Sequence, residues 1–157
     1  MSKSHGDGTP AYRDPASFKE SYKRGKKSDI FSLGVILWEI SSGKIPCEGR
    51  IETVDIILYR LDGSRDPPCS GTPEEYINLY SECWHEDANN RPSCETIYTR
   101  LKYYGEMNNL NKSLEIEPNN ALTLSQRGGV YGYLKQYDNA LNDFTKRWKL
   151  NRIMRGR

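Results

Sequence analysis

The stretch from residue 26 to residue 40, K-K-S-D-I-F-S-L-G-V-I-L-W-E-I, limits most strongly what this chain can fold into. Its apolar residues surround a helix instead of lining one face, and a helix apolar on all sides belongs inside a larger domain. We predict a buried helix over residues 29–42, ended by Gly43. The apolar positions are Ile30, Phe31, Leu33, Val35, Ile36, Leu37, Trp38 and Ile40.

Length and charge exclude several classes of protein. A chain of 157 residues allows one domain or two small ones. With 23 basic and 21 acidic residues, no global field attracts nucleic acid or a membrane surface. The longest apolar-rich stretch, residues 31–40, is half of the roughly 20 residues that a membrane helix needs. The first residues contain no apolar run typical of a secretory signal, so we expect a cytoplasmic protein without nucleic-acid or membrane partners.

The four cysteines indicate neither a disulfide framework nor a metal site. Cys47, Cys69, Cys83 and Cys94 contain no C-x-x-C pair, and we expect reduced thiols. His85 lies close to two of them, but the spacing offers no two-residue chelating turn. No metal ligand is therefore assigned.

Apolar residues at helical spacing predict further helices over residues 51–61, 72–84 and 94–104. The second of these should begin with a capping box, in which Thr72 is the N-cap and Glu75 lies three residues on. The predicted fold class is all-α.

Four motifs resemble parts of a protein kinase C-lobe, and they occur in the family's order. They are G-T-P-A-Y-R-D-P-A at residues 8–16, the D-x-F-S-x-G pattern from Asp29, S-G-K-I-P-C-E-G from Ser42, and C-W-H-E-D-A-N-N-R-P from Cys83. The resemblance implies that residues 1–104 are a partial C-lobe, from the end of the activation segment to the last helix. The Trp-Glu pair at 38–39 and the Cys-Trp pair at 83–84 favour the tyrosine-kinase-like branch. Thr9 is typical of Ser/Thr-specific members, and phosphorylation of Tyr stays open.

By this resemblance, Gly8, Thr9, Tyr12, Asp14 and Pro15 are a remnant of the activation segment and substrate loop. Thr9 and Tyr12 would shape the pocket for the substrate residue that follows the phosphoacceptor. The alternative is an ordinary surface loop.

The resemblance also implies four structural anchors of the lobe: Asp29, Gly34, Trp84 and Arg91. In the family, the residue at Asp29 holds backbone N–H groups of the catalytic loop. That loop is not in this sequence, so we expect Asp29 to act on the dipole of its own helix.

Arg91 would pair with a Glu that ends the activation segment in the family. Ala16 stands at that position, and Asp14 replaces an Ala two residues earlier. We therefore expect the ion pair to be absent, or another acid such as Glu20 to substitute. A buried Arg without a partner costs several kcal/mol.

The chemistry of phosphoryl transfer is missing from this sequence. A kinase needs a Gly-rich loop, a strand Lys, an H-R-D loop and a D-F-G Asp, and none of these motifs is present. We expect no ATP or Mg²⁺ site in this chain, although a full-length family member would use both to phosphorylate proteins. Upstream helices that cover the central helix in the family are also missing, so we expect an exposed apolar face along residues 29–42.

The rest of the chain contains an internal repeat with an offset of 34, which is the period of a tetratricopeptide repeat. The matched pairs include Tyr103 with Tyr137 and Ile116 with Leu150. Residues 105–157 resemble one and a half such repeats, and Gly128, Tyr131, Ala140 and Phe144 occupy the small and aromatic positions of that family. We predict an antiparallel helical hairpin over residues 121–150 that touches at Gly128 and Ala140. The alternative is an unrelated helical hairpin.

Together these resemblances indicate a piece of a tyrosine-kinase-like Ser/Thr kinase joined to tetratricopeptide repeats that bind a protein partner. The alternative is a non-catalytic interaction protein that keeps the lobe surface and the repeats as a docking module.

Overall fold

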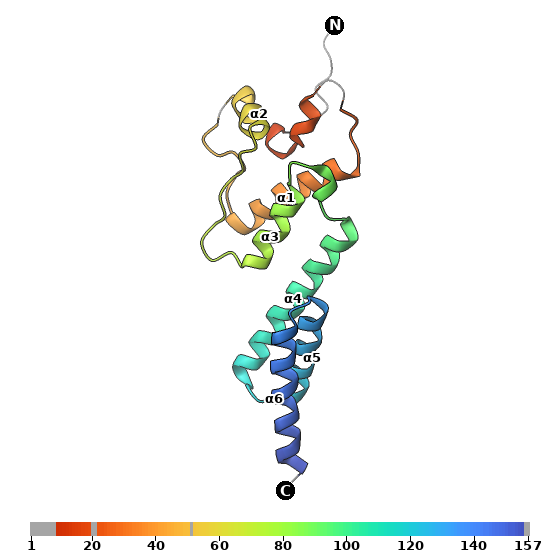
Figure 1. Cartoon of the computed structure of the whole chain (residues 1–157). Helices are drawn as coiled ribbons and strands as arrows, with labels where there is room; N and C mark the ends of the chain where they lie inside the picture. Colours follow the sequence, from red (N-terminus) through yellow and green to blue (C-terminus); the bar gives the residue numbers. More distant parts are fainter. Residues whose placement is uncertain (1–8, 20–21, 51, 156–157) are drawn as a thin grey trace. The chain divides into compact units, whose positions relative to one another are not determined.

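The computed structural model describes residues 9–19, 22–50 and 52–155, with side chains to residue 153 (Figure 1). The described residues contain helices and loops but no strand, which confirms the predicted all-α class. Two compact units divide after Cys94. Unit 1 holds η1 (Pro10–Tyr12), η2 (Pro15–Phe18), α1 (Lys26–Ser42), α2 (Thr53–Leu61), α3 (Glu74–Cys83) and η3 (Ala88–Asn90). Unit 2 holds α5 (Ala121–Tyr133), α6 (Tyr137–Arg155) and nearly all of α4 (Cys94–Ile116).

Helix α1 is the core of unit 1. It begins three residues earlier than predicted and ends as expected at Gly43, whose φ of 65° is the left-handed conformation that favours glycine. Phe31, Val35 and Trp38 are buried on one side of the helix. The other side is uncovered, since Ile36 and Ile40 are exposed. The expected exposed apolar face is therefore present in this chain.

Helix α3 packs directly on α1 (Figure 1). The two helices approach closely at Gly34, where an added Cβ would lie 2.8 Å from the Cβ of Cys83. Across the same interface the Tyr76 hydroxyl donates to the carbonyl of Leu37 at 3.1 Å. The predicted capping box at the start of α3 is wrong, because Pro73 is the N-cap and no side chain caps the helix.

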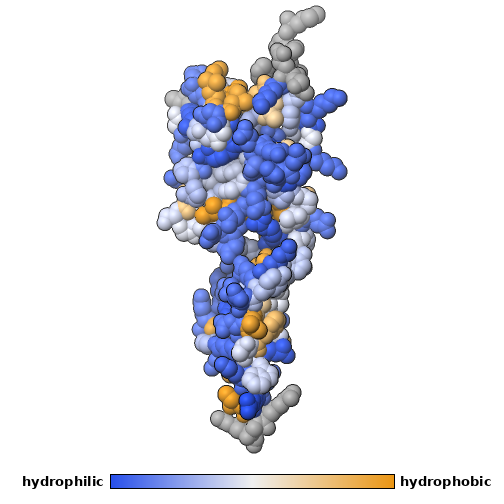
Figure 2. Space-filling view, viewed as in Figure 1, coloured by the Kyte–Doolittle hydropathy of each residue, from blue (hydrophilic) through white to orange (hydrophobic). Residues whose placement is uncertain are grey.

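Helix α2 closes unit 1 on the side of η1 and η2 (Figure 1). Its inner anchor is Arg60, which is fully buried and donates from Nη2 to Asp66 at 2.9 Å. The other carboxylate oxygen of Asp66 accepts from the backbone N–H of Cys47 at 3.1 Å. The outer face of α2 is apolar and exposed at Val54 and Leu58, and Figure 2 shows hydrophobic residues gathered over this helix.

Helix α4 is continuous across the boundary that we predicted between residues 104 and 105. No proline interrupts it before Pro118, so the helix that begins as the last one of the lobe continues without a break. The compact units divide ten residues earlier than the predicted domains. The assignment of residues 1–104 to one family and of residues 105–157 to another stays a prediction.

Unit 2 is built on the antiparallel pair α5 and α6, joined by a tight turn at Lys135 (φ 61°). Asn120 caps α5 by accepting from the N–H of Thr123 at 3.0 Å. Within this unit α4 meets α5 through side chains, as the rings of Tyr103 and Tyr133 lie 4.0 Å apart between centroids. The antiparallel hairpin therefore has the helices that the sequence predicted, although α6 extends five residues further.

Candidate functional site

The residues that resemble the end of an activation segment form a compact loop, which we name the 9–18 loop. A proline opens each of its two short 3-10 helices, since Pro10 and Pro15 hold a φ suited to a first helical position. Asp14 caps the second of them, because its Oδ1 accepts from the N–H of Ala16 at 3.1 Å. Gly8, which we assigned to the same segment, lies outside the described residues.

A buried ion pair fastens this loop to the rest of unit 1. Arg91 donates from Nη1 to Asp14 Oδ2 at 2.6 Å and from Nη2 to Asp14 Oδ1 at 3.2 Å, so the contact is bidentate. The two side chains are only 1% and 2% exposed. Arg91 thus has a carboxylate partner, and the expectation of an absent pair is wrong. The acid that substitutes is Asp14, whereas Glu20 lies outside the described residues.

Every remaining N–H group of the Arg91 guanidinium is also used. Nη1 donates to the carbonyl of Lys27 at 2.8 Å, Nη2 to that of Glu86 at 3.3 Å, and Nε to that of His85 at 2.8 Å. In return, the Lys27 ammonium donates to the carbonyl of Arg91. A planar guanidinium can serve all of these acceptors at once, and a Lys could not. One side chain therefore ties the 9–18 loop, the start of α1 and the segment before η3 together.

The surroundings of Asp14 keep it ionised. Burial by itself would raise the pKa of its carboxyl, but the hydrogen bonds and the charge of Arg91 and the N–H of Ala16 hold that pKa below its ordinary value. The Tyr22 hydroxyl donates to Asp14 Oδ2 at 2.9 Å and also contacts the hydroxyl of Ser28. A charged and fully bonded carboxylate is what a buried guanidinium needs.

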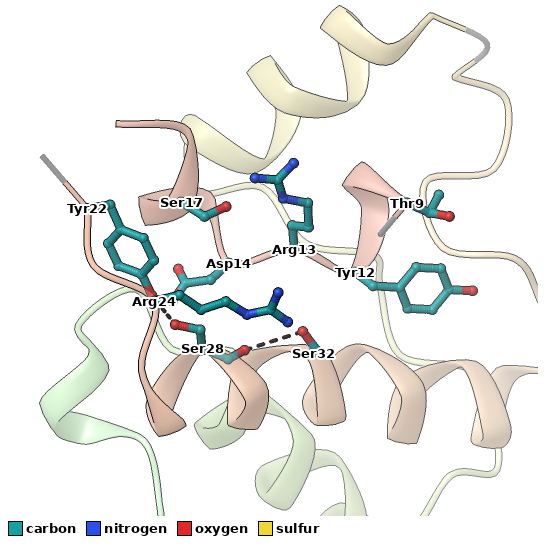
Figure 3. Close-up of a pocket in the computed structure, with 9 residues that line it drawn as sticks. All are labelled: Thr9, Tyr12, Arg13, Asp14, Ser17, Tyr22, Arg24, Ser28 and Ser32. Atoms are coloured by element: carbon teal, nitrogen blue, oxygen red, sulfur yellow. Dashed lines mark hydrogen bonds between the residues drawn. The ribbon is translucent and has the colours of Figure 1, made fainter. Parts of the chain in front are cut away.

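Asp14 also lines a cleft of about 240 Å³, shown in Figure 3. Its walls come from the 9–18 loop, from Tyr22 and Arg24 and from the first turns of α1, and most of the lining side chains carry a hydroxyl or guanidinium group. Tyr12 is fixed at one side because its hydroxyl donates to Glu39 Oε2 at 3.0 Å. Burial and this carboxylate raise the pKa of the Tyr12 phenol. The lining residues are Thr9, Tyr12, Arg13, Asp14, Ser17, Tyr22, Arg24, Ser28 and Ser32.

The other three anchors have different surroundings. Asp29 lies in the first turn of α1 with its side chain 68% exposed, and the nearest cation is Arg24 at 3.4 Å. Gly34 lies at the close approach of α1 and α3. Trp84 is buried and stacks edge to face on Tyr80 with centroids 5.1 Å apart.

Sequence reasoning did not identify the part played by Phe31 and Arg65. The ring of Phe31 is completely buried, and the guanidinium carbons of Arg65 and Arg91 lie 5.1 Å and 5.2 Å from its centroid. Arg65 also donates to the carbonyl of Trp84 at 3.2 Å and 3.3 Å. Burial, followed by the charge of other arginines, lowers its pKa. No local spacing signals such a stack, because the two arginines follow Phe31 by 34 and 60 residues.

In unit 2, two of the four predicted small and aromatic positions, Gly128 and Phe144, meet where α5 contacts α6. An added Cβ at Gly128 would lie 2.8 Å from the ring of Phe144, so these two residues touch. Ala140 is buried on α6. The ring of Tyr131 lies 5.7 Å from the guanidinium of Arg127.

The sequence did not predict an ion pair that joins the two helices of the hairpin. Arg127 donates from Nε and Nη2 to Asp143 at 2.7 Å and 2.8 Å, and from Nη1 to Asn111 of α4 at 2.9 Å. The carboxylate of Asp143 is buried, and this pair raises the pKa of Arg127. Three helices of unit 2 therefore meet at one guanidinium.

The described residues contain no cluster of His, Cys, Asp and Glu that could hold a metal ion. In the same part of the chain, no helix is both long and apolar enough to cross a membrane.

Comparison with known proteins agrees with the motifs of unit 1. Residues 3–101 match the family described as protein tyrosine and serine/threonine kinase. A putative serine/threonine-protein kinase/receptor, R831 of Acanthamoeba polyphaga mimivirus, is 34% identical over 94 residues, which is 60% of this chain and 6% of that protein. The probable serine/threonine-protein kinase drkA of Dictyostelium discoideum is 32% identical over 60% of this chain and 15% of its own length.

The tyrosine-protein kinase FRK of Homo sapiens is 34% identical over 87 residues, or 55% of this chain and 17% of that kinase. The chain thus spans less than a fifth of the length of each of these relatives. The family generally uses ATP and Mg²⁺ and acts on proteins. On the match over residues 3–101, this chain belongs to the protein tyrosine and serine/threonine kinase family.

Proposed function

We propose that residues 1–104 are the substrate-side part of a kinase C-lobe that does not transfer phosphate by itself. The bidentate contact between Asp14 and Arg91 supports this proposal most directly, because it fixes the 9–18 loop against the lobe. We assign the substrate peptide to the cleft that Thr9 and Tyr12 help to line. The whole protein would phosphorylate Ser or Thr, and Tyr stays possible because relatives of both kinds match.

Inactivity of this chain is proposed on chemical grounds. Phosphoryl transfer needs groups that hold the phosphates, a metal and a base next to the hydroxyl. The Gly-rich loop, the strand Lys, and the H-R-D and D-F-G motifs that supply them do not occur in this sequence. Titration of the purified chain with Mg·ATP should therefore give no binding heat, whereas saturable binding at submillimolar concentration would contradict the proposal.

The rival proposal is a non-catalytic docking module. One observation favours it, because Arg91 has all of its donors satisfied without any catalytic loop, so the 9–18 loop keeps its shape as a surface for binding. The coding sequence upstream of Met1 separates the two proposals. In-frame H-R-D and D-F-G motifs there support the kinase, and their absence supports the docking module.

We further propose that residues 105–157 are a tetratricopeptide-type segment that recruits a cytoplasmic protein partner. The contact of Gly128 with Phe144 and the burial of Ala140 support this assignment. The variant Ala140→Leu should overpack the hairpin and lower its stability by about 1–3 kcal/mol. Asn139→Leu, at the exposed neighbouring position, should change it little. Equal melting temperatures for both variants and the parent would remove this support.

A further inference from the structure

Helix α6 carries a stripe of four large apolar side chains that the hairpin leaves at least partly exposed. They recur at intervals of four, three and four residues, which places them on one face of the helix. They are between 41% and 66% exposed. We name them the α6 stripe: Tyr137, Leu141, Phe144 and Trp148. Ile153 is also exposed, but it lies five residues after Trp148 and therefore on a different face.

The neighbouring surface of α5 leaves room beside the stripe. The pair of Arg127 with Asp143 marks one edge of the contact between the two helices. Phe144 packs on Gly128, so the stripe follows the opposite edge. Gly129 follows Gly128 on this edge of α5, and an added Cβ at Gly129 would meet no atom within 4 Å. A further helix could therefore approach the stripe closely without displacing side chains.

The charges along α6 are divided between its two halves. Residues 145–153, T-K-R-W-K-L-N-R-I, contain four basic residues and no acidic one. The exposed acid of the helix is Asp138, near its beginning, since Asp143 is buried in its pair with Arg127. Asp138 and Arg152 are two heptads apart, so both lie on the same flank of the stripe.

This distribution is self-complementary when two copies of the helix run antiparallel. About a twofold axis near Phe144, the same flanks of the two helices meet, and Asp138 of each copy comes next to Arg152 of the other. Leu141 of one copy then faces Trp148 of the other. A parallel arrangement would instead bring two basic halves together, and like charges repel.

We propose that the α6 stripe is a homodimer interface in which α6 packs antiparallel on α6 of a second copy. Four side chains from each copy bury less than the roughly 800 Å² per partner of a standard interface. The dimer is therefore weak, and its population depends on protein concentration.

Sedimentation equilibrium of the full chain between about 1 µM and 1 mM covers the range of weak complexes. The parent should pass from monomer to dimer in this range. Leu141→Ala and Trp148→Ala should each raise the dissociation constant about tenfold or more, because central aromatic and aliphatic anchors dominate small interfaces. The matched control Ile153→Ala removes an equally exposed apolar side chain from another face and should leave the dissociation constant within about twofold. Circular dichroism checks that each variant stays helical.

A charge swap tests the orientation of the two helices. Asp138→Arg and Arg152→Asp should each weaken the dimer, and the double variant should restore it, since every opposed pair is again of opposite sign. A parent that stays monomeric to 1 mM would overturn the proposal. So would a dimer that is insensitive to both stripe variants, or a double variant weaker than either single one. Binding of a monomeric chain to anionic lipid vesicles through the stripe would assign this face to membranes instead.

Discussion

Removal of the Asp14 carboxylate should strongly destabilise unit 1. In Asp14→Ala, the Arg91 guanidinium stays buried, at 1% exposure, and loses both of its carboxylate contacts. Breaking a buried ion pair by removing one partner costs about 3–5 kcal/mol, because the other charge is left uncompensated. Domains are stable by only about 5–15 kcal/mol, so this single change should remove about a fifth or more of the stability of the unit.

Urea unfolding monitored by tryptophan fluorescence measures this effect. Trp38 and Trp84 are buried in unit 1 and report on its unfolding, whereas Trp148 is exposed in unit 2 and contributes background. Asp29→Ala is the matched control, because it removes an exposed carboxylate that lies 3.4 Å from a cation. Exposed ion pairs contribute at most about 1 kcal/mol to the free energy of unfolding, so this variant should change the urea midpoint little. If Asp14→Ala and Asp29→Ala shifted the urea midpoint equally, the buried pair would not hold the loop.

Two further results should follow from the same ion pair. Adding Ala16→Glu to Asp14→Ala returns the acid to the position that the family pattern gives it, and part of the lost stability should return. The pKa of Asp14 lies below its ordinary value of 3.8 in the folded chain. The carboxylate therefore stabilises the fold fully above the unfolded pKa, and this contribution is lost as pH falls through the folded pKa. The difference between parent and Asp14→Ala should accordingly shrink below about pH 4.

The glycines give the remaining predictions. Gly34→Ala should separate α1 from α3 and lower the urea midpoint, because the added Cβ would meet atoms of α3 and Trp84 at 2.8–3.0 Å. Gly105→Ala in α4 is the control, since its Cβ would enter open space and should not lower the midpoint. In unit 2, Gly128→Ala would press on a phenyl ring at 2.8 Å and should destabilise the hairpin. Gly129→Ala meets no atom within 4 Å and should stabilise α5 by about 1 kcal/mol, so a lower melting temperature for this variant would contradict the assigned helix faces.

The sequence predicted the helices more fully than it predicted the site. The apolar run predicted that α1 exists and Gly43 predicted where it ends, and both are local signals. The partner of Arg91 was missed because the acid was expected at or after position 16. The signal was nevertheless present in the sequence. Asp14 stands where the family pattern has Ala, and two residues later Ala16 stands where the pattern has Glu. The exchange keeps a carboxylate for the buried guanidinium, at a position that also caps η2.

Contacts between distant parts of the chain left no such signal. Arg127 and Asp143 are polar residues at helix positions that could equally face solvent, and only the packing of α5 on α6 decides that Asp143 is buried. The boundary that we predicted between residues 104 and 105 has no local signal either, because it lies inside α4. A continuous helix has no turn residues to mark where one packed core ends, and α4 crosses the predicted boundary without one.

A phosphate-transfer assay tests the central claim most directly. The purified chain is incubated with radiolabelled ATP, Mg²⁺ and a general protein substrate, next to a control without the chain. We expect the same incorporation in both, since the groups that bind phosphate and metal in this family do not occur in this sequence. Incorporation above the control that a substitution in this chain abolishes would show that it carries a catalytic site and would contradict the proposed function.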